Sequence, residues 1–151
     1  MNENFYTIVD SLIKLNEDNM RRQRDYLDHV PPISRAIHSA TVKVDLGRQV
    51  GKTTYIADNA RRGDLVIVGT HEDKRSFKNC KARILSAQEV FNGMNMSWRG
   101  LCKCDYNRIW IDEPRRVFGR NSANEYLKNL ELFYIYFGDR ANQFILLGAT
   151  L

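Results

Sequence analysis

The chain has 151 residues, of which 43% are hydrophobic and 27% are charged, and its formal net charge is +5. This length supports one compact domain and is too short for two domains with good cores of their own. No apolar run approaches the roughly 20 residues of a membrane span, so we expect no membrane partner. An acidic, amphipathic N-terminus argues against a signal peptide, and three cysteines without a disulfide-rich pattern suit a reducing cytosol. We therefore expect a cytoplasmic protein, and its positive charge permits an acidic partner such as nucleic acid.

Hydrophobic periodicity predicts helices and strands that alternate along the chain. An amphipathic helix is expected over Asn4 to Asn16, and a second helical stretch, Asp18 to His29, ends at Pro31 and Pro32. Further helices are expected at Ile33 to His38, Lys52 to Arg61, Glu72 to Asn79 and Ser122 to Leu132. Strands are expected at Thr41 to Leu46, Leu65 to Gly69, Ala82 to Ala87, Arg108 to Glu113 and Gln143 to Gly148. This order indicates a single α/β domain with a mainly parallel central sheet, in which an N-terminal helical segment (1–38) precedes the core (39–151).

The segment Asp45 to Thr54 has the pattern of a phosphate-binding loop. An apolar strand runs into a tight turn that opens a helix, so the backbone N–H groups of the loop form a nest for phosphates. Gly51 would let the backbone approach the phosphates, Lys52 would place a positive charge on the outer phosphates, and Thr53 would offer its hydroxyl to Mg²⁺. The usual first glycine of this motif is replaced by Leu46. The expected nucleotide-binding residues are Gly47, Arg48, Gln49, Val50, Gly51, Lys52, Thr53 and Thr54.

A second motif follows about 60 residues later, where the apolar run Ile109 to Ile111 ends in Asp112 and Glu113. A buried parallel strand with this sequence would deliver both carboxylates to the ligand crevice at its C-terminal end. We expect Asp112 to hold Mg²⁺ through water and Glu113 to orient and activate the attacking water. Taken alone, the pair also fits an edge strand followed by a solvated acidic turn. Its position after a Gly-Lys-Thr loop favours a P-loop ATPase.

The loop from Leu46 to Thr54 resembles that of the large terminases, the DNA-packaging ATPases of tailed phages. Those loops read small-Arg-Gln-apolar-Gly-Lys-Ser/Thr and lack the usual first glycine. Arg99-Gly100 is similar to a pair that such ATPases carry upstream of their acidic residues, and Phe144 to Thr150 resembles the coupling motif of helicase-like motors. Arg24 to Tyr26 is similar to an upstream adenine motif, although its glutamine is replaced here by Leu27. The resemblance covers roughly residues 20–151 and implies a P-loop NTPase fold of the additional-strand, RecA- and terminase-like type.

The resemblance also implies roles for individual residues. Arg48 would assist Lys52 and Glu113 in catalysis by stabilising charge on the γ-phosphate, and Thr150 would sense that phosphate or couple hydrolysis to motion. ATP and Mg²⁺ are the implied ligands. The implied partners are double-stranded DNA and further copies of the chain or a larger phage DNA-handling assembly in the host cytoplasm. Because the acidic pair is not joined by further clustered carboxylates, we expect no nuclease activity.

Three functions remain open at this point. The first is a Mg²⁺-dependent ATPase related to terminase and helicase motors, and the second is a nucleotide-binding regulatory module with little turnover of its own. A small-molecule kinase is the third, and the Asp-Glu pair, which is typical of water activation, argues against it. Scattered basic residues either converge on a nucleic-acid surface or cover solvated helix faces. These residues are Arg21, Arg22, Arg24, Arg61, Arg62, Arg115, Arg116 and Arg120, of which the last three also fit a role in a neighbouring subunit's site.

Overall fold

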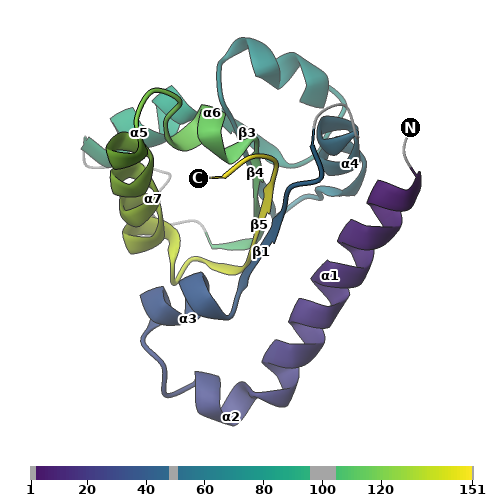
Figure 1. Cartoon of the computed structure of the whole chain (residues 1–151), viewed down its shortest axis with the longest axis vertical. Helices are drawn as coiled ribbons and strands as arrows, with labels where there is room; N and C mark the ends of the chain where they lie inside the picture. The colour runs from purple at the N-terminus through teal and green to yellow at the C-terminus, as the bar shows by residue number, and fades with distance from the viewer. Residues whose placement is uncertain (1–2, 48–50, 96–104, 151) are drawn as a thin grey trace.

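A sheet of five parallel strands forms the centre of the molecule (Figure 1). The computed structural model describes residues 3–47, 51–95 and 105–150. The strands are β1 (Thr41–Val44), β2 (Leu65–Val68), β3 (Arg83–Ser86), β4 (Tyr106–Asp112) and β5 (Ala141–Leu147). Their order across the sheet is β1-β5-β4-β2-β3, and all four adjacent pairs are parallel. The expected α/β class with a parallel central sheet is confirmed.

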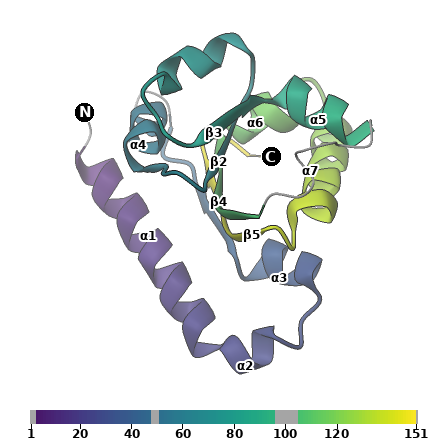
Figure 2. The ribbon, with the colours of Figure 1, turned by 180° about the vertical axis from the view of Figure 1, so that it is seen from behind.

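Helices cover both faces of this sheet and give the molecule three layers (Figures 1 and 2). One face carries α1 (Glu3–Arg22), α4 (Lys52–Asn59) and the 3₁₀ helix η1 (Glu72–Phe77). The other face carries α3 (Pro32–His38), α5 (Ala87–Asn95), α6 (Pro114–Phe118) and α7 (Ala123–Phe137). The short helix α2 (Arg24–Leu27) connects α1 to α3 at one end of the molecule.

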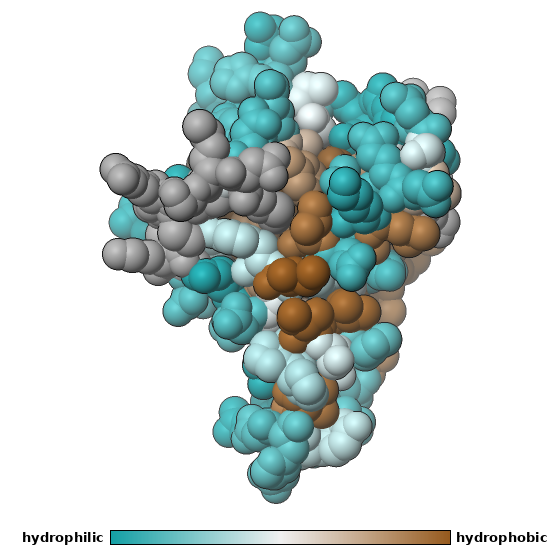
Figure 3. Space-filling view, turned by 90° about the vertical axis from the view of Figure 1, so that its left-hand side faces the viewer, coloured by the Kyte–Doolittle hydropathy of each residue, from teal (hydrophilic) through white to brown (hydrophobic). Residues whose placement is uncertain are grey.

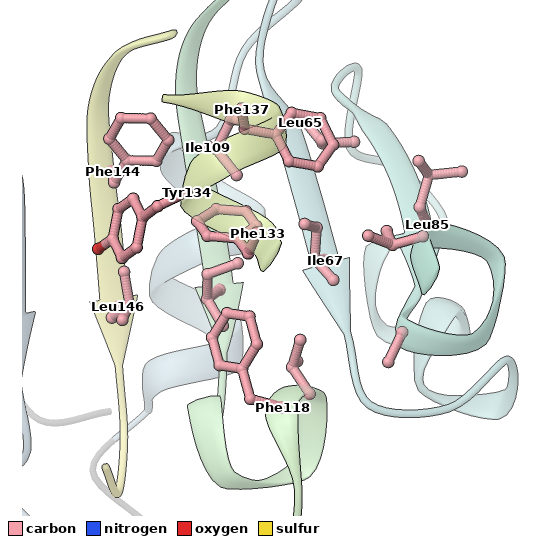
Figure 4. Close-up of a cluster of buried hydrophobic side chains, with 14 of the residues drawn as sticks. Leu65, Ile67, Leu85, Ile109, Phe118, Phe133, Tyr134, Phe137, Phe144 and Leu146 are labelled. Carbon is pink, nitrogen blue, oxygen red and sulfur yellow. The ribbon is translucent and has the colours of Figure 1, made fainter. Parts of the chain in front are cut away.

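Strands β2, β4 and β5 contribute to two separate cores because successive side chains of a strand point to opposite faces. In β5, Phe144 and Leu146 pack with α7, whereas Ile145 and Leu147 pack with α1 and α4. Aromatic rings fill much of the α7 side, where Phe133 lies at the centre of a group of edge-to-face contacts (Figure 4). Burial on both faces explains why these strands have continuous apolar sequences rather than alternating ones.

Helix α1 belongs to the second core. Its buried side chains Phe5, Val9 and Ile13 recur at helical spacing and face the sheet. Its polar residues are also held, since Glu17 forms an ion pair with Arg108 of β4 at 2.5 Å. Asn16 in turn accepts a hydrogen bond from the Gln143 amide. The N-terminal helical segment is therefore packed against the sheet along much of its length.

The side of the molecule that carries α3 and α7 shows a band of hydrophobic side chains among polar ones (Figure 3). The exposed large hydrophobic residues of these helices include Ile33, Ile37, Leu127 and Ile135. Surface patches of this kind are a common property of interaction sites. Among the described residues, no helix has both the length and the apolar content needed to cross a bilayer.

The structure corrects several predicted boundaries. Helix α1 continues to Arg22, so the first half of the stretch expected at Asp18 to His29 belongs to it, and α7 continues to Phe137. The continuations were missed because Asn16 to Arg22 is polar and because the end of α7 is rich in aromatic residues, which have no strong helical preference. Helices α5 and α6 were not predicted. Helix α6 is only five residues long and starts with Pro114, whose fixed φ suits the first turn of a helix.

Candidate functional site

Three parallel strands end at the same height at one edge of the sheet. In the register of the sheet, Leu147 of β5 lies beside both Val44 of β1 and Asp112 of β4. The predicted loop follows β1, and the predicted acidic pair lies at the end of β4. Because the strand ends are aligned, the fold brings together two motifs that are about 60 residues apart in the sequence.

The described part of the loop has glycine conformations at both ends. Gly47 has φ 92° and its N–H donates to the Asp45 side chain at 3.2 Å, while Gly51 has φ 88° and directly precedes α4. A side chain at either position would be strained in this left-handed region. Arg48, Gln49 and Val50 lie outside the described residues.

The two proposed metal ligands are in direct contact. The Thr53 hydroxyl, in the first turn of α4, donates to Oδ2 of Asp112 at 2.9 Å. Asp112 is 9% exposed, and within the described residues its other oxygen, Oδ1, has no hydrogen-bond partner although it is buried. Burial raises the pKa of Asp112 to about 6; the Thr53 hydrogen bond and Lys52 oppose this, and the Glu113 and Asp73 carboxylates add to it. A cation at this position would favour the ionised form of Asp112.

The residues present fit a magnesium ion that is also bound by phosphates. A buried carboxylate oxygen without a partner and a neighbouring hydroxyl are both hard oxygen ligands of the kind that Mg²⁺ takes. Within the described ranges, no three His, Cys, Asp or Glu side chains cluster closely enough to hold a metal by themselves. This is the usual situation for Mg²⁺, which keeps few protein ligands and takes the rest from water and phosphate.

Lys52 and Glu113 form an ion pair beside this pair of ligands. The Lys52 Nζ also donates to the carbonyl of Gly47 at 3.0 Å, so this side chain connects the start of α4 to the residues that follow β1. Glu113 has φ 61° and is the one non-glycine residue with positive φ in the described ranges. Non-glycine residues in such conformations often occur at functional sites, where the surrounding structure holds them. Sequence patterns predicted both residues here but not their contact.

Gly148 is a site residue that the motifs did not single out. It follows β5 with φ 125°, and a Cβ at this position would lie 2.5 Å from Oε1 of Glu113. Glycine at 148 therefore makes room for the carboxylate of the proposed general base. The one sequence signal was a glycine directly after a buried strand. Ala149, next to it, lines a pocket that Lys52 and Glu113 also line, whereas Thr150 is half-buried and does not line that pocket.

A pocket of about 720 Å³ opens above these residues and is rich in positive charge. Among the described residues, its charged lining consists of four cationic side chains (Lys52, Arg115, Arg116 and Arg120) and two carboxylates (Asp45 and Glu113). The three arginines were expected on a nucleic-acid surface, on solvated helix faces or in a neighbouring subunit's site. The structure places them around the pocket of their own chain, and their role in binding nucleic acid or a second subunit stays a prediction. Thr54 faces a second, polar hollow of about 810 Å³ that it shares with Thr53.

Other predicted residues lie elsewhere. Arg24 and Tyr26, in the segment similar to an adenine motif, belong to α2, which is at the opposite end of α1 from the loop (Figures 1 and 2). Arg61 and Arg62 follow α4 and precede β2, so they lie at the other edge of the sheet. The basic residues are therefore divided between the two edges and do not form one surface. Arg99 lies outside the described residues.

No known protein family matches the sequence, and a comparison with curated proteins gave no match.

Proposed function

We propose that this chain is a Mg²⁺-dependent ATPase of the P-loop class. The observation that carries the proposal is the contact between Thr53 and Asp112, in which one carboxylate oxygen accepts the hydroxyl and the other is buried without a partner. In P-loop enzymes the hydroxyl of the loop and the acid of the distant strand hold Mg²⁺ in this combination. Lys52 and the excess of cationic side chains in the pocket suit a polyphosphate.

The strand order supports the finer fold assignment. One strand, β5, lies between β1, which leads into the loop, and β4, which ends in the acidic pair. A strand inserted at this place is what the term additional-strand ATPase describes, and terminase and helicase motors are the members that the loop sequence resembles. The choice of adenine, the action on DNA and the place in a phage DNA-handling assembly rest on that resemblance. The exposed apolar band on α3 and α7 is a surface on which copies or partners could meet.

The residues divide the chemistry among them. Lys52 and the loop N–H groups bind phosphate oxygens, and Thr53 and Asp112 provide the ligands for Mg²⁺. When bound, the ion neutralises charge that develops on the phosphates. Glu113 accepts a proton from the attacking water, for which its carboxylate must leave Lys52. Gly148 leaves the space that the Glu113 carboxylate occupies at the pocket.

One observation favours a second function, that of a nucleotide-binding regulatory module with slow turnover. The proposed base, Glu113, is paired with Lys52, so its carboxylate is held by the lysine and is not free to contact an attacking water. Turnover would then depend on a partner, such as DNA, that separates the two side chains. The regulatory module should hydrolyse ATP slowly by itself and faster when DNA is added. The ATPase should hydrolyse ATP without such a partner.

The test is ATP turnover and nucleotide binding by wild type, Lys52→Ala and Glu113→Gln, each with and without double-stranded DNA. We expect Lys52→Ala to lose nucleotide binding, and Glu113→Gln to keep binding but to lose about 100-fold or more in turnover, as for a missing general base. Wild-type turnover in Glu113→Gln would show that the base is wrongly assigned. Absence of ATP binding by wild type would refute the proposal as a whole.

A further inference from the structure

Two of the pocket arginines have no carboxylate partner among the residues that the structure describes. Arg115 and Arg120 line the pocket that contains Lys52, and within the described part of the chain no carboxylate lies within ion-pair distance of either. Arg116 differs, since its guanidinium forms an ion pair with Asp73 at 2.8 Å. Because Lys52 is itself paired with Glu113, Arg115 and Arg120 are the cationic lining residues that form no ion pair within the described part of the chain.

The backbone that presents Arg115 is fixed to the site. Its N–H donates to the carbonyl of Ala149 at 3.1 Å, which links α6 to the residues after β5. Val117 and Phe118 of the same helix are buried in the core on the α7 side, so the opposite face of α6 is turned outward. Arg115 is exposed there, on a short helix whose position is set by strand ends on one side and core packing on the other.

The backbone on either side of Arg120 is held by a different set of contacts. The preceding residue, Gly119, donates its N–H to the carbonyl of Arg115 at 3.1 Å. The Asn129 side chain of α7 donates to the Phe118 carbonyl at 2.6 Å, which fixes the end of α6. The following cap residue, Ser122, accepts the N–H of Glu125 at 3.0 Å and starts α7. The chain between α6 and α7 is thus anchored on both sides of Arg120.

We propose that Arg115 and Arg120 bind the outermost phosphate of a nucleoside triphosphate in the same chain and so select triphosphate over diphosphate. The inference rests on the proposed nucleotide site and names the groups that read the length of the phosphate chain. Guanidinium groups suit this task because their N–H donors match phosphate oxygens and they stay charged. No second copy of the chain is needed, since both arginines line the same pocket as Lys52 and Glu113.

The experiment compares the affinities for a non-hydrolysable ATP analogue and for ADP, measured by calorimetry with Mg²⁺ on the whole chain. Variants are Arg115→Gln, Arg120→Gln and the double variant. Arg62→Gln is the matched control, an exposed arginine at the opposite edge of the sheet. We expect each single variant to lose about tenfold in affinity for the analogue, the scale of one charged hydrogen bond, and less than about twofold for ADP. The control should bind both nucleotides like wild type.

An equal loss for both nucleotides, or no loss for either, overturns the inference. A mixing experiment tests whether the arginines act within one chain. The double variant keeps Lys52, and Lys52→Ala keeps both arginines, so arginines that act on a neighbouring subunit would restore analogue binding or turnover in a mixture. Recovery therefore overturns binding in the same chain, and a mixture that shows only the activity of its parts supports it.

Failure of the inference can be told apart from failure of the proposed function. If wild type binds the analogue and Lys52→Ala does not, the nucleotide site stands, and an unchanged preference for triphosphate in the arginine variants overturns this inference alone. If wild type binds neither nucleotide, both proposals are overturned. Far-ultraviolet circular dichroism of each variant verifies that the fold is kept.

Discussion

Replacing Asp112 by asparagine should stabilise the free protein while it removes a proposed magnesium ligand. The wild-type carboxylate is buried beside Glu113 and Asp73, and burial raises its pKa from 3.8 to about 6. An unfolded chain exposes this group to water, so ionisation is harder in the folded state than in the unfolded state. Asparagine has nearly the same shape and no charge, and its amide oxygen can still accept the Thr53 hydroxyl.

The sign and the size of the effect follow from proton linkage. Between pH 3.8 and about 6 the folded state binds the Asp112 proton and the unfolded state releases it. The stabilising contribution of the protonated group is therefore fully present below pH 3.8 and is lost as the pH rises through about 6. A difference of roughly two pH units corresponds to about 3 kcal/mol, which is the cost of the ionised form at neutral pH. Part of this gain in the variant is offset by the NH₂ group of the new amide, which needs an acceptor.

The assay is urea unfolding without Mg²⁺ or nucleotide between pH 4 and 8, followed by tryptophan fluorescence, to which the buried Trp110 contributes. We expect Asp112→Asn to match wild type near pH 4 and to exceed its free energy of unfolding by about 1–3 kcal/mol above pH 7. Asp25→Asn, at an exposed position of α2, controls for the change in net charge. Addition of Mg²⁺ with an ATP analogue should stabilise wild type by about 3 kcal/mol at 100 times the dissociation constant and the variant much less. A difference between variant and wild type that does not change with pH would refute the burial argument.

The remaining predictions concern the glycine at the site and the scaffold around it. Gly148→Ala should lower kcat with little change in nucleotide affinity, because its Cβ would displace the Glu113 carboxylate, and an unchanged kcat would contradict the argument. The control is Gly63→Ala at the opposite edge of the sheet, where φ is 95°; it carries the same backbone strain and should keep kcat. Phe133→Ala should cost about 3–5 kcal/mol in urea unfolding because it empties the centre of the α7 core, and a loss below about 1 kcal/mol would show that the core closes around the gap. Asp64→Ala should cost about 3 kcal/mol or more, since the buried carboxylate accepts two backbone N–H groups and the Trp110 indole N–H, and a stability like that of wild type would mean that water replaces it.

Much of the fold could be predicted because parallel strands that are buried on both faces leave a plain signature. Two of these strands are apolar runs followed by glycine, Leu65 to Val68 and Phe144 to Leu147. The observed bounds of β2 and β5 differ from the expected ones by at most two residues. The order of the strands had no such signature. Nothing in the residues of β5 says that it lies between β1 and β4, because that position depends on which helices cross which face. Short helices such as α6 also escape periodicity, since five residues make little more than one turn.

For the site, sequence patterns predicted residues that the structure brings into contact and missed residues around them, such as Gly148. Lys52, Thr53 and Asp112 belong to motifs whose spacing has a physical reason, and the structure brings them together. The close approach of Gly148 to Glu113 depends on the relative height of two strand ends, which a pattern within one segment cannot express. The partnerless state of Arg115 within the described ranges likewise depends on which carboxylates the fold places nearby. Such features need the three-dimensional structure.

The residues of the candidate site lower the free energy of unfolding, whereas the two hydrophobic cores raise it. Ionised Asp112 costs about 3 kcal/mol at neutral pH, and the left-handed backbone of Glu113 costs on the order of 1–3 kcal/mol. The buried carboxylate and the left-handed backbone are both held in place because buried residues pack on either face of β4 and β5, next to these strand ends. Substitutions that remove these costs at the sheet edge should therefore stabilise the protein and reduce its activity. Substitutions in the two cores should destabilise the protein and leave the site residues unchanged. A stabilising effect of Asp112→Asn together with loss of Mg²⁺ binding would place this edge among sites that are maintained for function at the expense of stability.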